Sequence, residues 1–393
     1  MRILHVLGIV DPAWGGPPRV AVRLAAAQAA LGHDAHLLSY VAEGATDWLD
    51  DQIGHVPAFD RVTIHRLDSP SLLERITAAR ARRILRPLMP QMDWVHIHGI
   101  WERLLMAAAD TAFAAGVPYC VRPAGMLDSW SLNQKKLKKR IAMALGYRKS
   151  LERAAFFHTL TRVEAEFKTR LQLAPPCEHI PNGVFIEEID PLPPAGCFRA
   201  KHEQLCGRRF ILFMSRLHHK KGLDLLAEAF RIVAAREPDV HLVVAGPDDG
   251  EKEPFEQAIA AAGLSARVHL LGPIYMQEKI AALRDSDCFC LPSREEGFSV
   301  AVLEALAVGV PVVISEHCNF DEVQTRGAGF VTRLDPGEIA AGLLAALADR
   351  ATRDLMGTAG RTLITEQYTW SRVAAATIAA YEKYLAPATR PSP

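Results

Sequence analysis

Residues 287–314 read DCFCLPSREEGFSVAVLEALAVGVPVVI, two apolar runs separated by a polar loop and an alanine-rich segment. The runs 287–291 and 310–314 have the length and composition of buried parallel strands. Ser299 is a suitable N-cap for a helix that ends at Gly309. The stretch therefore predicts strand, loop, helix and strand, which is the repeating unit of a parallel sheet covered by helices.

The same alternation runs along the whole chain. The expected strands are 2–8, 35–40, 93–98, 117–121, 155–160, 209–214, 240–245, 267–271, 287–291 and 310–314. Alanine-rich stretches such as 18–31 and 222–235 are the expected helices between them. Only segment 187–207, dense in Pro and Gly, lacks a clear period and reads as a linker. The simplest architecture is two α/β, Rossmann-like halves with ligand sites at the carboxyl ends of their strands.

Composition narrows the class of protein. The 393 residues hold 45 Lys plus Arg and 45 Asp plus Glu, so net charge gives no reason to expect a nucleic-acid partner. No apolar run reaches the roughly 18 residues that a membrane helix needs, and the N-terminus reads as a strand rather than a signal peptide. Seven scattered cysteines suit reduced thiols in a cytoplasmic protein.

The loop after strand 209–214 reads SRLHHKKG and then opens a helix. Arg216 can bind phosphate oxygens in a fork, Lys221 can add a point charge, and free backbone amides face an anion at the start of the helix. This loop therefore predicts a diphosphate site. The alternative is a solvated basic turn.

Two glutamates mark the stretch quoted first. Glu296 lies in the loop before the helix, and Glu304 lies on its second turn, where burying a carboxylate is costly unless it is paired. A phosphate site between two hydroxyl-binding carboxylates describes a sugar nucleotide. The alternative makes Glu296 a partner of the helix dipole and Glu304 half of a buried salt bridge. The aspartate pairs 248–249 and 285–287 invite a metal interpretation, but we expect no metal site at either pair.

These motifs resemble glycosyltransferase family 4, a family of retaining enzymes with the GT-B fold. PSREEGFSVAVLEALAVGVPVV, residues 292–313, is similar to the family's signature of two glutamates separated by seven residues. The other matching stretches are SRLHHKKG (215–222), IPNGV (180–184), HIHG (96–99) and WGGPPRV (14–20). Ser215 replaces the family's usual glycine, and Phe185 stands where aspartate is common. The resemblance implies two Rossmann-like domains facing across a cleft.

The resemblance also implies domain limits. The N-terminal acceptor-binding domain would span 1–186, followed by the linker 187–207 and a nucleotide-sugar-binding domain at 208–370. The last helix and tail, 371–393, would cross back to the N-terminal domain.

The implied donor site contains eight residues. They are Gly16, Arg216, Lys221, Glu296, Phe298, Ser299, Val300 and Glu304. Arg216 and Lys221 would hold the diphosphate, while Glu304 would bind the ribose hydroxyls. Glu296 would touch the hydroxyls of the transferred sugar, and His98 would lie near the reacting carbon. Catalysis would then depend on Glu296, His98, Arg216 and Lys221.

Backbone groups would complete the phosphate site. The amides of residues 298–300 would face the diphosphate, and Gly16 would approach it from the opposite domain, because only glycine lets backbone come so close. A nucleoside diphosphate is a good leaving group, so cations and a helix dipole could stabilise its charge without a metal or other cofactor. Attack on the same face of the sugar, with the departing phosphate as base, would need no protein nucleophile.

The acceptor side carries a basic segment. NQKKLKKRIAMALGYRKSLER, residues 133–153, holds eight cations and one anion beside a partial apolar stripe at helical spacing. Such a helix suits an anionic membrane surface on the inner face of the plasma membrane, and a lipid-linked glycan acceptor. The alternative is a solvated helix whose stripe faces the core. Arg122 and Asp128, in RPAGMLD, are candidate acceptor contacts.

Overall resemblance to bacterial enzymes of surface-polysaccharide assembly predicts transfer of a hexose from a GDP- or UDP-linked donor. An alternative is a sugar-nucleotide epimerase of similar two-domain build, although both donor motifs together favour a transferase. A dinucleotide-dependent oxidoreductase would need a Gly-x-Gly-x-x-Gly turn, which neither half has. A non-catalytic carbohydrate-binding relative would not be expected to keep both glutamates and both cations.

Overall fold

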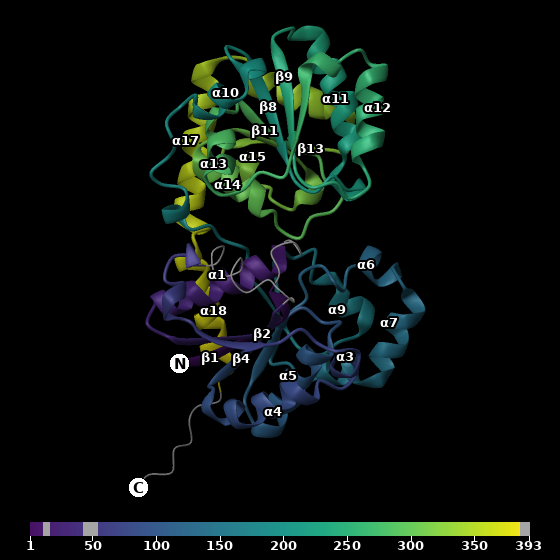
Figure 1. Ribbon diagram of the computed structural model, residues 1–393, viewed down its shortest axis with the longest axis vertical. Helices are drawn as coiled ribbons and strands as arrows, with labels where there is room; N and C mark the ends of the chain where they lie inside the picture. The colour runs from purple at the N-terminus through teal and green to yellow at the C-terminus, as the bar shows by residue number, and fades with distance from the viewer. Residues whose placement is uncertain (11–15, 42–53, 386–393) are drawn as a thin grey trace. The chain divides into compact units, whose positions relative to one another are not determined.

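The computed structural model describes residues 1–10, 16–41 and 54–385. The chain divides into two compact units, each built on one parallel sheet (Figure 1). The first unit comprises Met1–Asn182 together with Trp370–Pro393, and the second comprises Gly183–Thr369. No helix within the described ranges is both long enough and apolar enough to cross a membrane.

The sheet of the first unit has seven strands in the order β3-β2-β1-β4-β5-β6-β7. They are β1 (Arg2–Val10), β2 (Asp34–Val41), β3 (Thr63–Leu67), β4 (Trp94–His98), β5 (Tyr119–Arg122), β6 (Phe156–Thr159) and β7 (Cys177–His179). The strand order reverses between β1 and β4, which pair in parallel with His5 beside His96. Ligands of open α/β sheets bind at such a switch point, outside the carboxyl ends of the strands.

The two faces of this sheet differ in chemistry. Leu4, Val6, Val95 and Ile97 point into an apolar core that includes helices α4 (Ala79–Leu88) and α5 (Arg103–Ala115). The alternate residues of β1 and β4 point to the other face, where α1 (Gly16–Ala30) contacts α18 (Trp370–Tyr384) (Figure 1). The helix expected near the C-terminus is α18, and it belongs to the first unit.

Smaller helices complete the first unit. They are α3 (Leu72–Thr77), α6 (Ser129–Asn133), α7 (Lys136–Ala142), α8 (Arg148–Glu152) and α9 (Glu166–Leu171). The prediction of one helix over 133–153 is wrong, because α7 and α8 are separated by a π-helical turn, Met143–Tyr147. Gly146 lies in that turn with φ +115°, a backbone conformation that glycine adopts without steric cost.

The sheet of the second unit has six strands in the order β10-β9-β8-β11-β12-β13. They are β8 (Arg209–Met214), β9 (Val240–Ala245), β10 (Val268–Gly272), β11 (Cys288–Leu291), β12 (Val312–Ser315) and β13 (Gly329–Thr332). Its helices are α10 (Cys197–Lys201), α11 (Leu223–Arg236), α12 (Lys252–Ala261), α13 (Met276–Asp285), α14 (Val300–Val308), α15 (Glu322–Thr325), α16 (Pro336–Leu347) and α17 (Arg350–Gln367). Its switch point lies between β8 and β11.

The segment 187–207, expected as a linker, contains α10 and lies in the second unit. The Asp285 carboxylate accepts hydrogen bonds from the backbone amides of Gly196 (2.6 Å) and Phe198 (2.9 Å) at the start of this helix. Asp287 accepts the backbone amide of Phe210 at 3.0 Å and forms an ion pair with Arg199. Both aspartates therefore anchor the segment to the second unit.

Candidate functional site

Three loops gather at the carboxyl edge of the second sheet, after β8, β9 and β11. Gly222, with φ +71°, brings the β8 loop so close to the β11 loop that a Cβ atom there would lie 2.1 Å from the carbonyl oxygen of Pro292. A Cβ atom on Gly246 would similarly lie 1.8 Å from the carbonyl oxygen of Ser215. The two glycines therefore permit the close contact that assembles the basic and acidic loops into one site.

Glu296 is held firmly in the β11 loop. Lys221 Nζ lies 2.5 Å from Glu296 Oε1, and the Ser293 hydroxyl donates to the same oxygen at 2.7 Å. The Lys221 and Glu296 side chains are only 16% and 10% exposed. Asn319 Nδ2 donates to the Glu296 carbonyl oxygen at 2.9 Å. Among the described residues no hydrogen-bond donor reaches Oε2.

Glu304 lies on α14 and is paired with a residue that the motifs do not indicate. Lys279, on α13, places its Nζ 2.5 Å from Glu304 Oε1. This ion pair explains how a carboxylate is accommodated in an apolar helix. The alternative of a salt bridge therefore describes the Lys279–Glu304 pair, and contact of Glu304 with ribose hydroxyls stays a prediction.

Neighbouring side chains hold the start of α14 in place. The Ser299 hydroxyl accepts the backbone amide of Val302 at 3.5 Å, as expected for the N-cap. The Phe298 ring is buried against Phe320 and Tyr368, with ring centroids 4.8 and 5.5 Å away. Packing of Phe298 thus fixes the direction of the backbone amides at residues 298–300.

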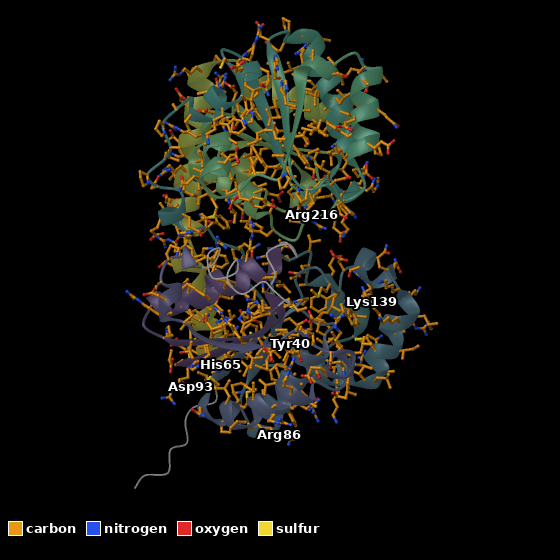
Figure 2. The ribbon with its side chains drawn as sticks, viewed as in Figure 1. Tyr40, His65, Arg86, Asp93, Lys139 and Arg216 are labelled. Atoms are coloured by element: carbon orange, nitrogen blue, oxygen red, sulfur yellow. The ribbon has the colours of Figure 1, made fainter. Side chains whose placement is uncertain are left out.

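The basic loop carries acidic partners as well. Arg216 lies at the end of β8, at the edge of the second unit (Figure 2). Its Nη1 donates to Asp249 at 2.6 Å, and both side chains are about half exposed. Asp248 instead accepts the backbone amides of Gly250 and Lys252 before α12. The two aspartates therefore serve different partners.

His98 is the last residue of β4 in the first unit and belongs to a cluster of buried imidazoles. His5 Nδ1 lies 3.0 Å from His98 Nε2, and the rings of His96 and His98 stack with centroids 4.3 Å apart. Burial lowers the pKa of His5 to about 4, and it holds the pKa of His96 and His98 well below the ordinary value. These rings are neutral at pH 7, so His98 offers a hydrogen bond rather than a charge.

The ligand atoms of His5, His96 and His98 lie within 4.8 Å of one another, close enough to raise the question of a metal centre. The planes of His96 and His98 differ by only 6°, and those of His5 and His98 by 27°. An imidazole lone pair lies in the plane of its ring, so stacked rings cannot direct their lone pairs at one ion. The cluster therefore fits hydrogen bonding better than metal coordination.

The two candidate acceptor residues are engaged inside the first unit. Arg122, at the end of β5, is buried and donates through Nη2 to Asn182 Oδ1 at 2.6 Å. Burial lowers the pKa of Arg122 to about 10. The Asp128 carboxylate accepts the backbone amide of Ser131 at 2.7 Å, at the start of α6. These bonds give both residues a structural role, and their contact with an acceptor stays a prediction.

Gly16 is the first residue of α1. The preceding Trp14 and Gly15 of the glycine-rich loop lie outside the described residues. The approach of Gly16 to a donor therefore stays a prediction. Lys279 was not indicated by any motif, because its partner Glu304 lies on another helix and no local spacing connects the two residues.

Comparison with known proteins identifies the family. Residues 15–183 match the "Glycosyl transferase 4-like domain", and residues 198–363 match "Glycosyl transferases group 1". A GDP-mannose-dependent monoacylated α-(1-6)-phosphatidylinositol monomannoside mannosyltransferase from Corynebacterium glutamicum is 30% identical over 223 residues, 54% of this chain and 57% of the relative. A phosphatidyl-myo-inositol mannosyltransferase from Mycobacterium tuberculosis is 31% identical over 212 residues, 52% of this chain and 53% of the relative. The chain thus matches about half the length of these curated relatives.

Solved structures support the fold over nearly the whole chain. The Anabaena protein HepE, crystallised with UDP and glucose, superposes with a TM-score of 0.75 at 18% identity, covering 98% of this chain and all of that one. WaaG, a glycosyltransferase involved in lipopolysaccharide biosynthesis, gives a TM-score of 0.68 at 19% identity over 96% of this chain and 99% of that one. The predicted GT-B class of two parallel α/β sheets is confirmed. The chain therefore belongs to glycosyltransferase family 4.

Proposed function

We propose that the protein is a retaining, metal-independent glycosyltransferase that moves a hexose from a nucleoside-diphosphate sugar to a lipid-linked glycan in surface-polysaccharide assembly. One observation carries the donor half of this proposal. Lys221, Ser293 and Glu296 form a hydrogen-bonded group at the switch point of the second sheet, beside the start of α14. A cation, a held carboxylate and the N-terminus of a helix are the groups that a sugar diphosphate needs.

The donor would be bound along this edge. Arg216 and Lys221 would take the diphosphate oxygens, with the amides at 298–300 completing the phosphate site. Glu304 would accept the ribose hydroxyls beside Lys279. Glu296 would accept hydroxyls of the transferred sugar through Oε2. Gly16 and His98 would contribute from the first unit.

The reaction needs charge stabilisation more than it needs a nucleophile. The cations and the helix dipole would stabilise the departing diphosphate, whose oxygen would take the proton from the attacking acceptor hydroxyl on the same face of the sugar. Glu296 suits binding rather than covalent attack, because Lys221 and Ser293 both donate to its Oε1. His98, being neutral, would hydrogen-bond a sugar hydroxyl near the reacting carbon.

The membrane part of the proposal rests on α7 and the turn that follows. Leu137, Ile141 and Leu145 are 71%, 51% and 69% exposed among several lysines and arginines. The alternative in which the whole apolar stripe faces the core fails for these three residues, although Tyr147 and Leu151 are buried. Lys139 turns inward, with its Nζ 5.2 Å from the Trp101 ring (Figure 2). Exposed apolar side chains within a basic helix favour the anionic inner face of the plasma membrane.

Donor binding can be tested with GDP, UDP, ADP and their common hexose conjugates in the presence of EDTA. A ligand that binds only the folded state raises the melting temperature according to RT ln(1 + [L]/Kd). We expect GDP or UDP and the corresponding sugar to raise it, and Glu304→Ala to remove most of that effect. Conversion of a nucleotide sugar to its epimer without an acceptor would instead support the epimerase alternative.

A further inference from the structure

A continuous chain of hydrogen bonds connects His98 to the C-terminal helix α18. His98 Nε2 lies 3.0 Å from His5 Nδ1, and His5 Nε2 lies 2.8 Å from Gln28 Oε1. Gln28 Nε2 donates to the Tyr381 hydroxyl at 3.3 Å, and that hydroxyl lies 2.6 Å from His96 Nδ1. All five side chains are buried, with at most 6% of their surface exposed.

The Gln28 amide fixes the direction of the bonds on the His98 side. Its Oε1 can only accept, so His5 Nε2 carries the proton of that ring. Because burial keeps His5 neutral, its Nδ1 is unprotonated and must accept. His98 therefore donates from Nε2, and its Nδ1 carries a lone pair that has no partner among the described residues.

The same amide fixes the other branch. Gln28 Nε2 donates to the Tyr381 oxygen, so the phenolic proton is free to be donated to His96 Nδ1. Burial raises the pKa of Tyr381, which keeps that proton in place. His96 therefore carries its own proton on Nε2, a donor that likewise finds no partner within the described part of the chain.

We infer that Gln28 and Tyr381 are positioning residues that hold His98 with an unprotonated Nδ1, ready to accept a hydrogen bond from a hydroxyl group of the transferred sugar. A buried acceptor without a partner is costly, and such a group in a native protein calls for an explanation such as a ligand. This inference rests on the proposed function, because it assigns the ligand to the sugar of the donor. It also gives α18 a functional role, because Tyr381 lies on that helix. The hydrogen-bonded chain His98–His5–Gln28–Tyr381–His96 is called the relay below.

Kinetics of matched variants test the relay in the full-length protein. Gln28→Met keeps the side-chain length but removes both bonds of the amide, and Tyr381→Phe removes only the hydroxyl. We expect each to lower kcat about 10- to 100-fold, because a displaced or wrongly protonated contact is lost in the transition state. The Kd for the nucleoside diphosphate should not change, since the diphosphate does not touch His98. The double variant should be no slower than the slower single variant, because both break one chain.

The control is a second histidine pair in the same sheet. His36 Nδ1 lies 3.0 Å from His65 Nε2 and the rings stack, but no hydrogen bond between described residues connects this pair to the relay. His65→Asn should leave kcat within about twofold of the wild type. If Gln28→Met and Tyr381→Phe also stay within that range while remaining folded, or if their effects on kcat multiply, the relay is refuted.

The protonation state can be read without any substrate. In 15N-histidine-labelled protein, long-range 1H–15N correlation distinguishes a protonated ring nitrogen from an unprotonated one, and His98→Asn assigns the signal. We expect Nδ1 of His98 to be unprotonated in the wild type and to shift toward a mixture of tautomers in Gln28→Met. A protonated Nδ1 in the wild type would mean that Gln28 is oriented the other way, and the inference would be wrong. If the spectrum is as expected but His98→Asn keeps full transferase activity, the contact between His98 and the sugar is refuted. If the wild type itself has no transferase activity, the proposed function alone is refuted.

Discussion

Donor binding should become tighter when Asp249 is replaced by asparagine. Arg216 Nη1 lies 2.6 Å from the Asp249 carboxylate, and an incoming diphosphate has to compete for the same guanidinium. The pair is exposed, 57% for Arg216 and 43% for Asp249, so it contributes only about 0.2–1 kcal/mol. Removing this competition should lower the Kd for the nucleoside diphosphate about 1.4- to 5-fold.

The neighbouring aspartate supplies the control. Asp248→Asn removes the same charge from the same loop, but the Asp248 carboxylate accepts backbone amides, whereas the ion pair of Arg216 is with Asp249. Isothermal titration with the nucleoside diphosphate should show tighter binding for Asp249→Asn than for Asp248→Asn. The difference should shrink in 0.5 M salt, because exposed pairs are screened. Equal gains in the two variants would show that net charge alone matters, and weaker binding by Asp249→Asn would refute competition for Arg216.

Three further predictions concern catalysis, the membrane and pH. Glu296→Gln should lower kcat about 100- to 1000-fold with little change in the Kd for the nucleoside diphosphate, and a sugar trapped covalently on Glu296 would overturn the proposed mechanism. Leu137→Ser combined with Ile141→Ser should weaken sedimentation with anionic vesicles. Leu355, which is 73% exposed on α17, supplies the control, and Leu355→Ser should have no effect. Equal effects would argue against a membrane role for α7. Folding lowers the pKa of His5 from 6.5 to about 4. Between those pH values the unfolded state binds more protons than the folded state, so the free energy of unfolding should decrease as pH falls. His5 should account for up to about 3 kcal/mol of this decrease. Urea unfolding at pH 7 and pH 4.5 measures the drop, and His5→Gln should show a smaller one.

The alternating pattern of the sequence predicted the interior of both sheets. All ten expected strands correspond to strands of the structure, because central parallel strands are buried on both faces and therefore read as apolar runs. The three missed strands are β3, β7 and β13, and each is the edge of its sheet. An edge strand is short and partly exposed to solvent, so it can contain polar residues. His65 and Arg66 in β3 and Glu178 in β7 interrupt the apolar run by which a strand is recognised.

The sequence indicates the candidate residues whose signal is local. Arg216, Lys221, Glu296 and Glu304 each stand in a loop or helix turn with its own motif, and their contacts with a donor stay predictions. Lys279 was missed, because its ion pair with Glu304 is made between two helices. The relay was missed for the same reason. Its residues come from four elements, β1, α1, β4 and α18, and the bonded residues lie far apart in the sequence.

The first unit combines two separate segments, Met1–Asn182 and Trp370–Pro393. It therefore cannot be completed until the second segment has been synthesised. Trp370, Thr377 and Tyr381 of α18 are completely or almost completely buried there, so residues 1–182 leave the ribosome with one sheet face lacking its last covering helix. Translation of the whole intervening unit Gly183–Thr369 at about 5–20 residues per second takes roughly 10 to 40 seconds. During that interval the nascent N-terminal segment exposes a histidine-lined, partly apolar surface that a chaperone can bind. The later-synthesised unit is continuous, so it can finish folding before the unit whose synthesis began first.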